Sequence, residues 1–230
     1  MQHPPPLSPQ VAQVWLQGIP PLEELLPSLS LLSPEERNKA EHLRLPADQR
    51  RFLAGRLFLR RLLSRYSGLP PESIGIEQGP KGKPYWRDPP QPIQFNLSHS
   101  HEQILVALAL NQRVGVDLEW IRPVRHWQAI AQRYFSPTEQ ADLAHCPEDE
   151  RDALFFQLWT RKEALLKATG TGWAGAKTLA MKDSVLTSQG IGAAWSILPL
   201  EIGVGYAAAV AVEKMGAQLP RVLLHRDKRS

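Results

Sequence analysis

The sequence predicts an α+β protein built from two similar halves, and two observations support this fold class. A short segment, LSPEE at residues 32–36, recurs as FSPTE at residues 135–139, and each copy is followed by a longer amphipathic segment. In both halves, short β-rich stretches then follow the helical segments. Helical blocks that precede strands in the same order twice are typical of duplicated α+β subdomains with small sheets.

The elements of the first half follow from local signals. Ser33 can cap a helix, the proline after it suits the first helical turn, and Glu36 can complete a capping box. The amphipathic pattern that follows predicts a longer helix over residues 48–66, which stops at Gly68. Alternating or continuous apolar stretches predict strands at residues 93–97, 103–110 and 114–120.

The second half repeats these signals. Ser136 and Glu139 form the second capping box, and a longer helix is predicted over residues 149–168, ending at Gly170. Strands are predicted at residues 178–186, 193–198 and 205–212. Two related halves that meet edge to edge create a cleft, and ligands tend to bind in clefts, so we expect the polar motifs to converge there.

Composition limits the class of protein. A chain of 230 residues with 43% hydrophobic content can bury one sizeable core or two small ones without disulfides or structural zinc. Cys146 has no second thiol to pair with, which favours a reducing compartment. No secretory signal pattern is visible, and the longest apolar runs, residues 104–110 and 206–212, are far shorter than the roughly 20 residues of a membrane-spanning helix. We therefore expect a cytoplasmic protein that does not act at a membrane.

A pair of carboxylates is the first candidate for chemistry. Asp117 and Glu119 are two residues apart in the strand predicted at residues 114–120, so both project from the same face. Mg²⁺ prefers oxygen ligands of this kind, completed by water and substrate phosphate. The structural alternative is an exposed strand face that carries two acids.

The second candidate is the segment LWTRKEALLK at residues 158–167, which is followed by ATGTG. Glu163 and Lys167 are four residues apart and share one face of the predicted helix. Glu163 could be a third metal ligand or accept a proton from a hydroxyl nucleophile, and Lys167 could stabilise a phosphate. The alternative is a surface ion pair between these two residues, which contributes only about 0.3–0.5 kcal/mol.

Two polar segments of the first half are further candidates. In FNLSHS, residues 95–100, a short strand leads into a polar turn in which Ser98, His99 and backbone N–H groups could bind phosphate. Neighbouring residues of an extended chain point to opposite faces, so this Ser-His pair does not indicate a hydrolase triad. In GPKGKP, residues 79–84, a mobile basic loop could contact phosphate or nucleotide.

Taken in order, four segments resemble the Sfp-type 4'-phosphopantetheinyl transferases. They are GKP at residues 82–84, FNLSHS at 95–100, GVDLE at 115–119, and Trp159 to Gly172 in the pattern WxxKEAxxKxxGxG. The resemblance covers about residues 30–212. It implies a monomer of two α/β subdomains related by a pseudo-two-fold axis, each a small antiparallel sheet packed with helices, with the active site between them.

The resemblance also implies that the two halves of the chain have different functions. Residues 1–112 form the N-terminal half, which contacts coenzyme A, and residues 113–220 form the C-terminal half, which carries the metal and catalytic motifs. The basic residues 221–230 are expected to be a disordered tail.

For the reaction itself, the resemblance implies a Mg²⁺-dependent phosphoryl transfer. Asp117, Glu119 and Glu163 are implied as ligands of Mg²⁺, together with the pyrophosphate of coenzyme A. Glu163 is also implied as the base for the acceptor hydroxyl, directly or through water, and Lys167 as the residue that holds the transferring phosphate. The sequence leaves open whether Mn²⁺ serves better than Mg²⁺.

Coenzyme A is the implied co-substrate. The implied contacts are Ser98, His99 and Lys167 for the phosphates, Lys83 and Pro84 for the adenosine, and Lys39 and Arg51 for the 3'-phosphate. Glu36 stands where some relatives carry a lysine, which puts the details of the 3'-phosphate subsite in doubt.

The implied acceptor is a serine of an apo acyl or peptidyl carrier protein, and the implied products are the holo-carrier and adenosine 3',5'-bisphosphate. The carrier could belong to a fatty acid synthase, a polyketide synthase or a peptide synthetase, and the sequence does not choose among them. We expect no nucleic-acid partner.

Two other functions stay open on the sequence. Another Mg²⁺-dependent phosphoryl-transfer enzyme, such as a nuclease, could use the same carboxylates, although aromatic residues are only 7% of the chain and lie mostly at expected core positions. The second alternative function is a non-catalytic module that binds coenzyme A or a carrier protein. Such a module would not need three converging carboxylates.

Overall fold

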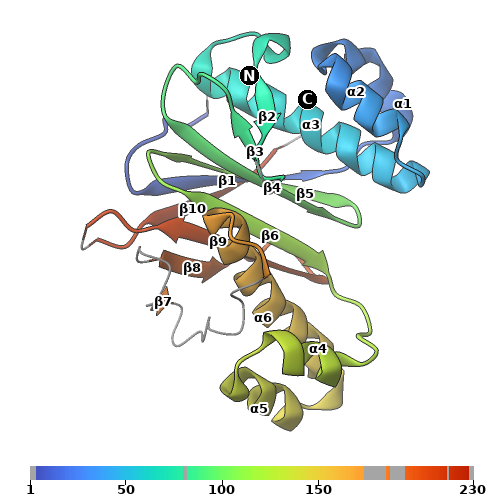
Figure 1. The fold of residues 1–230 in the computed structure, drawn as a ribbon, viewed down its shortest axis with the longest axis vertical. Coiled ribbons are helices and arrows are strands. Elements are labelled where there is room, and N and C mark those ends of the chain that lie inside the picture. Colours follow the sequence, from blue (N-terminus) through green and yellow to red (C-terminus); the bar gives the residue numbers. More distant parts are fainter. Residues whose placement is uncertain (1–3, 80–81, 174–184, 187–194, 217, 228–230) are drawn as a thin grey trace.

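The computed structural model describes residues 4–79, 82–173, 185–186, 195–216 and 218–227. Two four-stranded sheets occupy the middle of the molecule, with helices α1–α3 at one end and α4–α6 at the other (Figure 1). This layered arrangement of helices and sheets confirms the α+β class and the division into two halves, each of which mixes helices with a small sheet.

The first half builds the sheet with strand order β10-β1-β5-β4, in which β5 pairs antiparallel with both β1 and β4. Its elements are β1 (Val11–Gly18), α1 (Leu22–Leu25), the 3-10 helix η1 (Leu26–Leu31), α2 (Pro34–Glu41), α3 (Pro46–Ser67), η2 (Pro71–Ser73), β2 (Ile76–Gln78), β3 (Pro84–Trp86), β4 (Ile93–Ser100) and β5 (Gln103–Leu110). The long helix α3 packs its buried leucines and Phe58 against this sheet.

The second half builds an antiparallel sheet with strand order β6-β9-β8-β7. Its elements are β6 (Val114–Trp120), α4 (Trp127–Tyr134), α5 (Pro137–His145), α6 (Glu148–Thr169), β7 (Val185–Leu186), β8 (Trp195–Pro199) and β9 (Tyr206–Glu213). Helix α6 packs on β6, β8 and β9. Most of the predicted strand at residues 178–186 lies outside the described residues.

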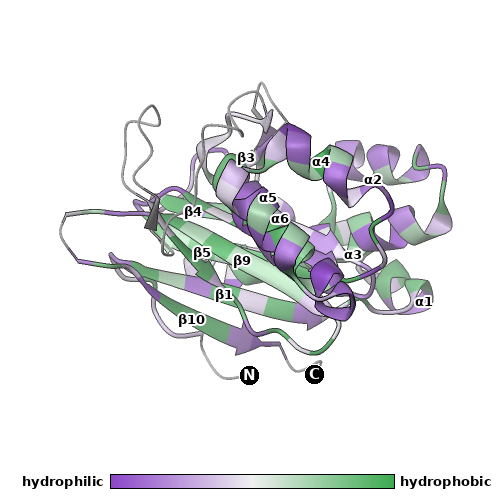
Figure 2. Ribbon diagram, turned by 90° about the horizontal axis from the view of Figure 1, so that it is seen from below, coloured by the Kyte–Doolittle hydropathy of each residue, from purple (hydrophilic) through white to green (hydrophobic). Residues whose placement is uncertain are grey.

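The two halves share one apolar core. Its buried residues come from strands of both sheets: Val14 and Leu16 from β1, Leu105 and Ala107 from β5, Val116 and Leu118 from β6, and Val210 and Val212 from β9. Figure 2 shows hydrophobic stretches of β5 and β9 in the middle of the molecule and many hydrophilic residues on the outer helices. Because of the strand alternation, the residues of β6 between these apolar positions face α6 instead.

Both predicted capping boxes are confirmed. Ser33 accepts a hydrogen bond from the Glu36 N–H and donates its own N–H to the Glu36 carboxylate, and Ser136 and Glu139 do the same. The long helices α3 and α6 end at Gly68 and Gly170, which have φ angles of 75° and 70°. In this left-handed conformation glycine avoids the strain that a Cβ would cause.

The repeat extends to a contact that the sequence did not reveal. In each half the capping glutamate also pairs with a buried cation of the long helix. Glu36 Oε2 lies 2.8 Å from Arg60 Nε, and Glu139 Oε2 lies 2.9 Å from Lys162 Nζ. Arg60 and Lys162 are 1% and 0% exposed, so these pairs join the short helix to the long one inside the protein.

The prediction of a disordered tail after residue 220 is wrong for Arg221–Arg226. These residues form β10, which pairs in parallel with β1, so the first sheet is mixed and not antiparallel throughout. The apolar side chains of Val222 and Leu224 pack against the shared core, and the basic residues of the segment hid this strand pattern. The C-terminal strand therefore completes the sheet of the first half.

Three further strands were not predicted. Residues 11–18 form β1, and β2 pairs with β3 around the loop predicted at residues 79–84. Among the helices in the described ranges, none is long and apolar enough to cross a membrane.

The contact between β6 and α6 gives a stability prediction for Gly115. A Cβ at this position would lie 2.1 Å from Ala164 O and 2.3 Å from Ala168 N, both backbone atoms that cannot move without displacing the helix. We expect Gly115→Ala to destabilise the protein by about 3 kcal/mol or more, which lowers the melting temperature by roughly 10 °C.

The matched control is Gly55→Ala in α3, where the added Cβ would meet Leu97 at an ordinary distance of 3.5 Å. Helix propensity predicts that this change is neutral or slightly stabilising. Thermal unfolding followed by circular dichroism measures both variants, and equal melting temperatures would contradict the predicted close contact.

Candidate active site

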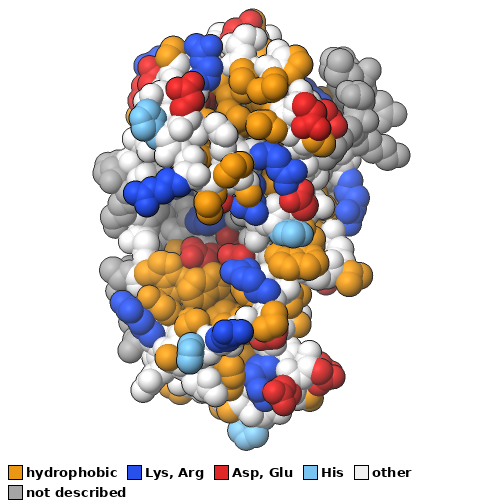
Figure 3. All heavy atoms as spheres, turned by 90° about the vertical axis from the view of Figure 1, so that its right-hand side faces the viewer, with side chains coloured by type: hydrophobic (Ala, Val, Ile, Leu, Met, Phe, Trp, Pro, Cys, Tyr) orange, Lys and Arg blue, Asp and Glu red, His pale blue; other side chains and the backbone are white. Residues whose placement is uncertain are grey.

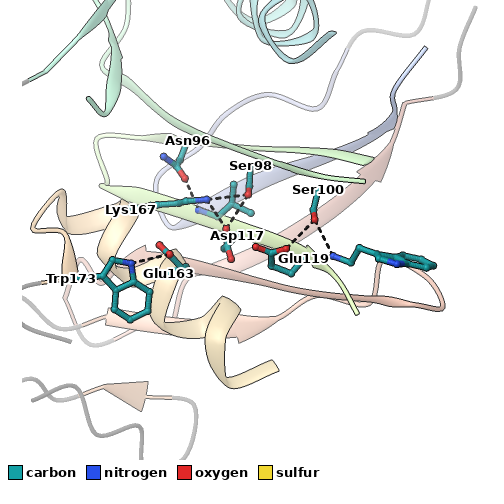
Figure 4. A network of polar contacts seen from close by, with 10 residues as sticks. Asn96, Ser98, Ser100, Asp117, Glu119, Glu163, Lys167 and Trp173 are labelled. Carbon is teal, nitrogen blue, oxygen red and sulfur yellow. Dashed lines mark hydrogen bonds and ion pairs between the residues drawn. The ribbon is translucent and has the colours of Figure 1, made fainter. Parts of the chain in front are cut away.

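The predicted motifs converge where β4 of the first half lies against β6 of the second and α6 covers β6. Figure 3 shows acidic side chains in a hollow between the two halves, beside basic residues and above a hydrophobic surface. Figure 4 shows the polar contacts that join the three elements.

Asp117 lies at the centre of this network and is 4% exposed. Its Oδ1 accepts hydrogen bonds from Lys167 Nζ at 2.5 Å and from Ser98 Oγ at 3.0 Å. Its Oδ2 is buried and has no hydrogen-bond partner among the described residues. Burial raises the pKa of Asp117 above the ordinary value, against the attraction of the Lys167 ammonium.

Glu119 lies on the same face of β6, two residues further along, as predicted. Its Oε2 accepts hydrogen bonds from Ser100 Oγ at 3.0 Å and from Arg122 Nη1 at 3.2 Å. The contact with Ser100 comes from the first half and the contact with Arg122 from the second. Glu119 is thus held by both halves.

Glu163 on α6 is half-buried, and its Oε1 accepts a hydrogen bond from Trp173 Nε1 at 3.1 Å. Burial and the neighbouring carboxylate of Asp117 raise the pKa of Glu163 above 4.5. Lys167, one turn later, makes its ion pair with Asp117 on β6. This ion pair therefore runs between helix and strand and not along the surface of α6.

Ser98 and His99 point to opposite faces of β4. The expected polar turn starts later than predicted, because β4 continues through Ser100. The Ser98 hydroxyl faces β6, where it accepts from Lys167 Nζ at 3.0 Å and donates to Asp117. The ring of His99 lies on the other face, near Gly55 of α3.

Lys83 and Pro84 lie at the junction of the two halves. They line a cavity of about 270 Å³ together with Glu163, Lys167 and Trp173. The Lys83 ammonium donates to the Ala168 carbonyl at 2.9 Å and to the Val114 carbonyl at 3.4 Å. Burial, together with the charge of Arg113, lowers the pKa of Lys83 to about 8.

Lys39 and Arg51 were predicted to act together, but they line different hollows. Lys39 lines a cavity of about 760 Å³ next to α2, with its Nζ 5.4 Å from the centre of the Phe52 ring. Arg51 lines a cavity of about 370 Å³ that also contains His99. The Arg51 guanidinium pairs with Asp48 at 2.8 Å and donates to the His101 carbonyl.

The carboxylates fit a divalent cation by their chemistry, although no three Asp, Glu, His or Cys side chains of the described segments lie close enough together to form a complete site. One oxygen of Asp117 has no hydrogen-bond partner within the described ranges, and all three groups are the hard oxygen donors that Mg²⁺ prefers. Because Mg²⁺ is commonly bound by one or two carboxylates plus phosphates and water, a partial protein site suits a metal that arrives with its substrate.

Sequence reasoning missed four residues of the network: Asn96, Ser100, Arg122 and Trp173. A signal existed for Asn96 and Ser100, because Asn96, Ser98 and Ser100 alternate as they would on one strand face. Trp173 and Arg122 gave no local signal, since their contacts depend on how the chain turns after α6 and β6.

Comparisons with known proteins agree with this geometry. A family model for the 4'-phosphopantetheinyl transferase superfamily matches residues 113–197, and a model for the N-terminal part of 4'-phosphopantetheinyl transferases matches residues 17–112. The 4'-phosphopantetheinyl transferase HetI of Nostoc sp. is 35% identical over 225 residues, which are 95% of each chain. The 4'-phosphopantetheinyl transferase Sfp of Bacillus subtilis is 35% identical over 144 residues, 63% of this chain and 62% of its own length.

The raised pKa of Glu163 predicts that Glu163→Gln stabilises the protein in the absence of metal. At neutral pH the folded state must hold an ionised carboxylate in a place that favours the neutral form, whereas the unfolded chain does not. We expect the melting temperature in EDTA at pH 7.5 to rise by at least about 2 °C.

The gain should shrink as the pH falls toward 4.5, because the wild-type carboxyl then takes up a proton in the folded state, and it should vanish below 4.5, where the unfolded chain is protonated as well. Glu201→Gln removes the same charge from an exposed position and serves as the control. A melting temperature for Glu163→Gln at or below that of the control would refute the electrostatic reasoning.

The lowered pKa of Lys83 gives a second pH prediction. Between about 8 and 10.5 the unfolded chain holds a proton on this amine that the folded protein has released, so wild-type stability rises with pH in this range relative to a variant without the amine. Urea unfolding of wild type and Lys83→Met at pH 7.5 and pH 9.5 measures the effect. A stability difference that is the same at both pH values would contradict it.

Proposed function

The chain belongs to the 4'-phosphopantetheinyl transferase superfamily, and we propose that it transfers the phosphopantetheine arm of coenzyme A to a serine hydroxyl of an apo acyl or peptidyl carrier protein. Transfer of 4'-phosphopantetheine from coenzyme A to carrier proteins is the activity of this superfamily, and the chain is an enzyme of this type. Membership decides against the nuclease and the non-catalytic module that the sequence left open.

One observation carries the proposed mechanism. Lys167 from α6 and Asp117 from β6 meet in the cleft, and the second oxygen of Asp117 is buried with no hydrogen-bond partner in the part of the chain that the structure describes. This second carboxylate oxygen of Asp117, which suits a cation, therefore lies next to the ammonium of Lys167, which suits a phosphate. Phosphoryl transfer needs this combination, because charge develops on the phosphate oxygens while the phosphate bonds are exchanged.

We propose that Asp117, Glu119 and Glu163 hold Mg²⁺, or Mn²⁺ in its place. Enzymes of this superfamily generally use Mg²⁺ and coenzyme A. When bound, the ion neutralises negative charge on the pyrophosphate. Asp117 contributes the oxygen that has no hydrogen-bond partner among the described residues. The raised pKa values of Asp117 and Glu163 support the assignment, because a bound cation offsets the cost of burying these two charges.

In the proposed reaction, the serine oxygen attacks the β-phosphorus of coenzyme A. The bond from this phosphorus to the bridging oxygen breaks, and adenosine 3',5'-bisphosphate leaves with that oxygen. Glu163 accepts the serine proton, directly or through one water. Lys167 donates to the phosphate that is transferred, and no covalent enzyme intermediate is needed.

We assign the coenzyme A contacts to both sides of the cleft. Lys83 and Pro84 border the cavity that also holds Glu163 and Lys167, which supports their proposed place beside the adenosine. His99 and Ser98 are proposed phosphate contacts, with Ser98 acting beside Lys167. Lys39 and Arg51 are proposed to contact the 3'-phosphate of coenzyme A. Because they line separate cavities, each would approach this phosphate from its own cavity.

The protein is proposed to act as a cytoplasmic monomer, because both walls of the cleft come from one chain. Its acceptor is proposed to be a free carrier protein or a carrier domain of a fatty acid synthase, polyketide synthase or peptide synthetase.

Intact-mass spectrometry of an apo carrier protein, incubated with the enzyme, coenzyme A and Mg²⁺, tests the proposal. We expect a mass gain of one phosphopantetheine that is absent in EDTA. Glu163→Gln should lower the rate by about 10²–10⁴-fold, the usual effect of losing a general base. Glu201→Gln should leave the rate unchanged.

Carriers from all three pathway types are assayed side by side. No mass gain with any of them would overturn the acceptor assignment, and full activity of Glu163→Gln would overturn its role as the base. An equal rate with and without EDTA would overturn the metal assignment alone.

A further inference from the structure

Strands β4 and β6 belong to different sheets, yet they lie against each other along the cleft. Each is the end strand of its own sheet, so its outer backbone groups lack a partner strand. Such groups need other hydrogen-bond partners when they are buried. Side chains of β4 supply such partners to two backbone N–H groups of β6.

Three alternating residues of β4 make these contacts. Asn96 Oδ1 accepts from the Val116 N–H at 2.9 Å, and Ser100 Oγ accepts from the Trp120 N–H at 3.1 Å. Between them, Ser98 Oγ donates to Asp117. The spacing of two residues places all three side chains on the face of β4 that meets β6. Figure 4 shows this row of contacts.

Ser100 makes two bonds with one hydroxyl. The oxygen accepts from the Trp120 N–H, and the hydroxyl proton is donated to Glu119 Oε2 at 3.0 Å. Because the bond to the backbone fixes the oxygen, the proton has a defined direction, and it points at the carboxylate. Ser100 therefore fixes the Glu119 carboxylate relative to the backbone of β6, the strand that carries Glu119.

Without this hydroxyl, Arg122 would be the one remaining side-chain donor to Glu119 among the described residues. Arg122 is exposed and lies three residues further along the chain, outside β6. A carboxylate held only by this arginine is pulled toward the surface and away from Asp117. Groups that orient a metal ligand in this way usually change metal affinity by 10–100-fold when they are removed.

We propose that Ser100 is a positioning residue that orients Glu119 toward the cation. The inference rests on the proposed function, in which Asp117 and Glu119 hold that cation. The first half then does more than bind coenzyme A: its strand β4 shapes the metal site carried by the second half.

The test measures Mn²⁺ binding by electron paramagnetic resonance of the free ion, with the full chain and with coenzyme A present or absent. We expect Ser100→Ala to weaken Mn²⁺ binding about tenfold. Ser100→Thr keeps the hydroxyl and should restore most of the affinity. Gln94→Ala changes an exposed residue of the same strand and should bind as wild type does.

Two measurements on Ser100→Ala distinguish a positioning role of Ser100 from a general structural role: the affinity for coenzyme A in EDTA and the melting temperature. Positioning predicts that Ser100→Ala keeps wild-type affinity for coenzyme A in EDTA. A loss of coenzyme A affinity equal to the loss of Mn²⁺ affinity would overturn the inference, because it would indicate general damage to the cleft.

Asp117→Asn distinguishes failure of the inference from failure of the proposed function. If Asp117→Asn weakens Mn²⁺ binding and Ser100→Ala does not, the metal site stands and the role of Ser100 is wrong. If neither variant changes Mn²⁺ binding, or wild type binds none, the assignment of the cation to these carboxylates is itself wrong.

Discussion

The buried carboxylate of Asp117 is the constraint on which the rest of the structure depends. A charge that is 4% exposed requires partners, and it receives them from two other elements, Lys167 on α6 and Ser98 on β4. The same contacts fix the helix on its sheet and the first half against the second. A shift of α6 or of β4 would remove one of these two partners, so the position of the halves and the shape of the site are set together.

The helices and sheets around Asp117 are arranged similarly in the two halves, but the polar side chains that the halves carry differ. Each half has a capping box whose glutamate also pairs with a buried cation, Arg60 in one half and Lys162 in the other. These pairs serve the same structural purpose, because each holds a short helix against a long one. The long helices differ in composition: α3 is rich in arginine, whereas α6 carries Glu163 and Lys167, which line the cavity between the halves. This difference accords with our proposal that the second half holds the cation and the transferred phosphate.

The sequence correctly predicted those features that depend on residues close together in the chain. The capping boxes, the glycine helix ends and the two carboxylates on one strand face each depend on residues within a few positions of one another. The parallel pairing of β10 with β1 could not be read in this way, because it joins segments about 200 residues apart and the partner strand itself was missed. Strand β1 did carry a signal in the alternation of Ala12, Val14 and Leu16, which all enter the shared core.

The roles of individual polar residues were the hardest to predict, for the same reason. Ser98 and Ser100 look alike in the sequence, and only the placement of β6 determines that one serine meets Asp117 and the other Glu119. That placement also requires Gly115, whose missing side chain lets the backbone of α6 approach β6. The close approach brings Glu163 near Asp117. Burial raises the pKa of both carboxylates, and the charge of Asp117 raises that of Glu163 further. The fold therefore holds carboxylates whose charged form is disfavoured, and a cation that binds only the folded chain both offsets this cost and stabilises the protein.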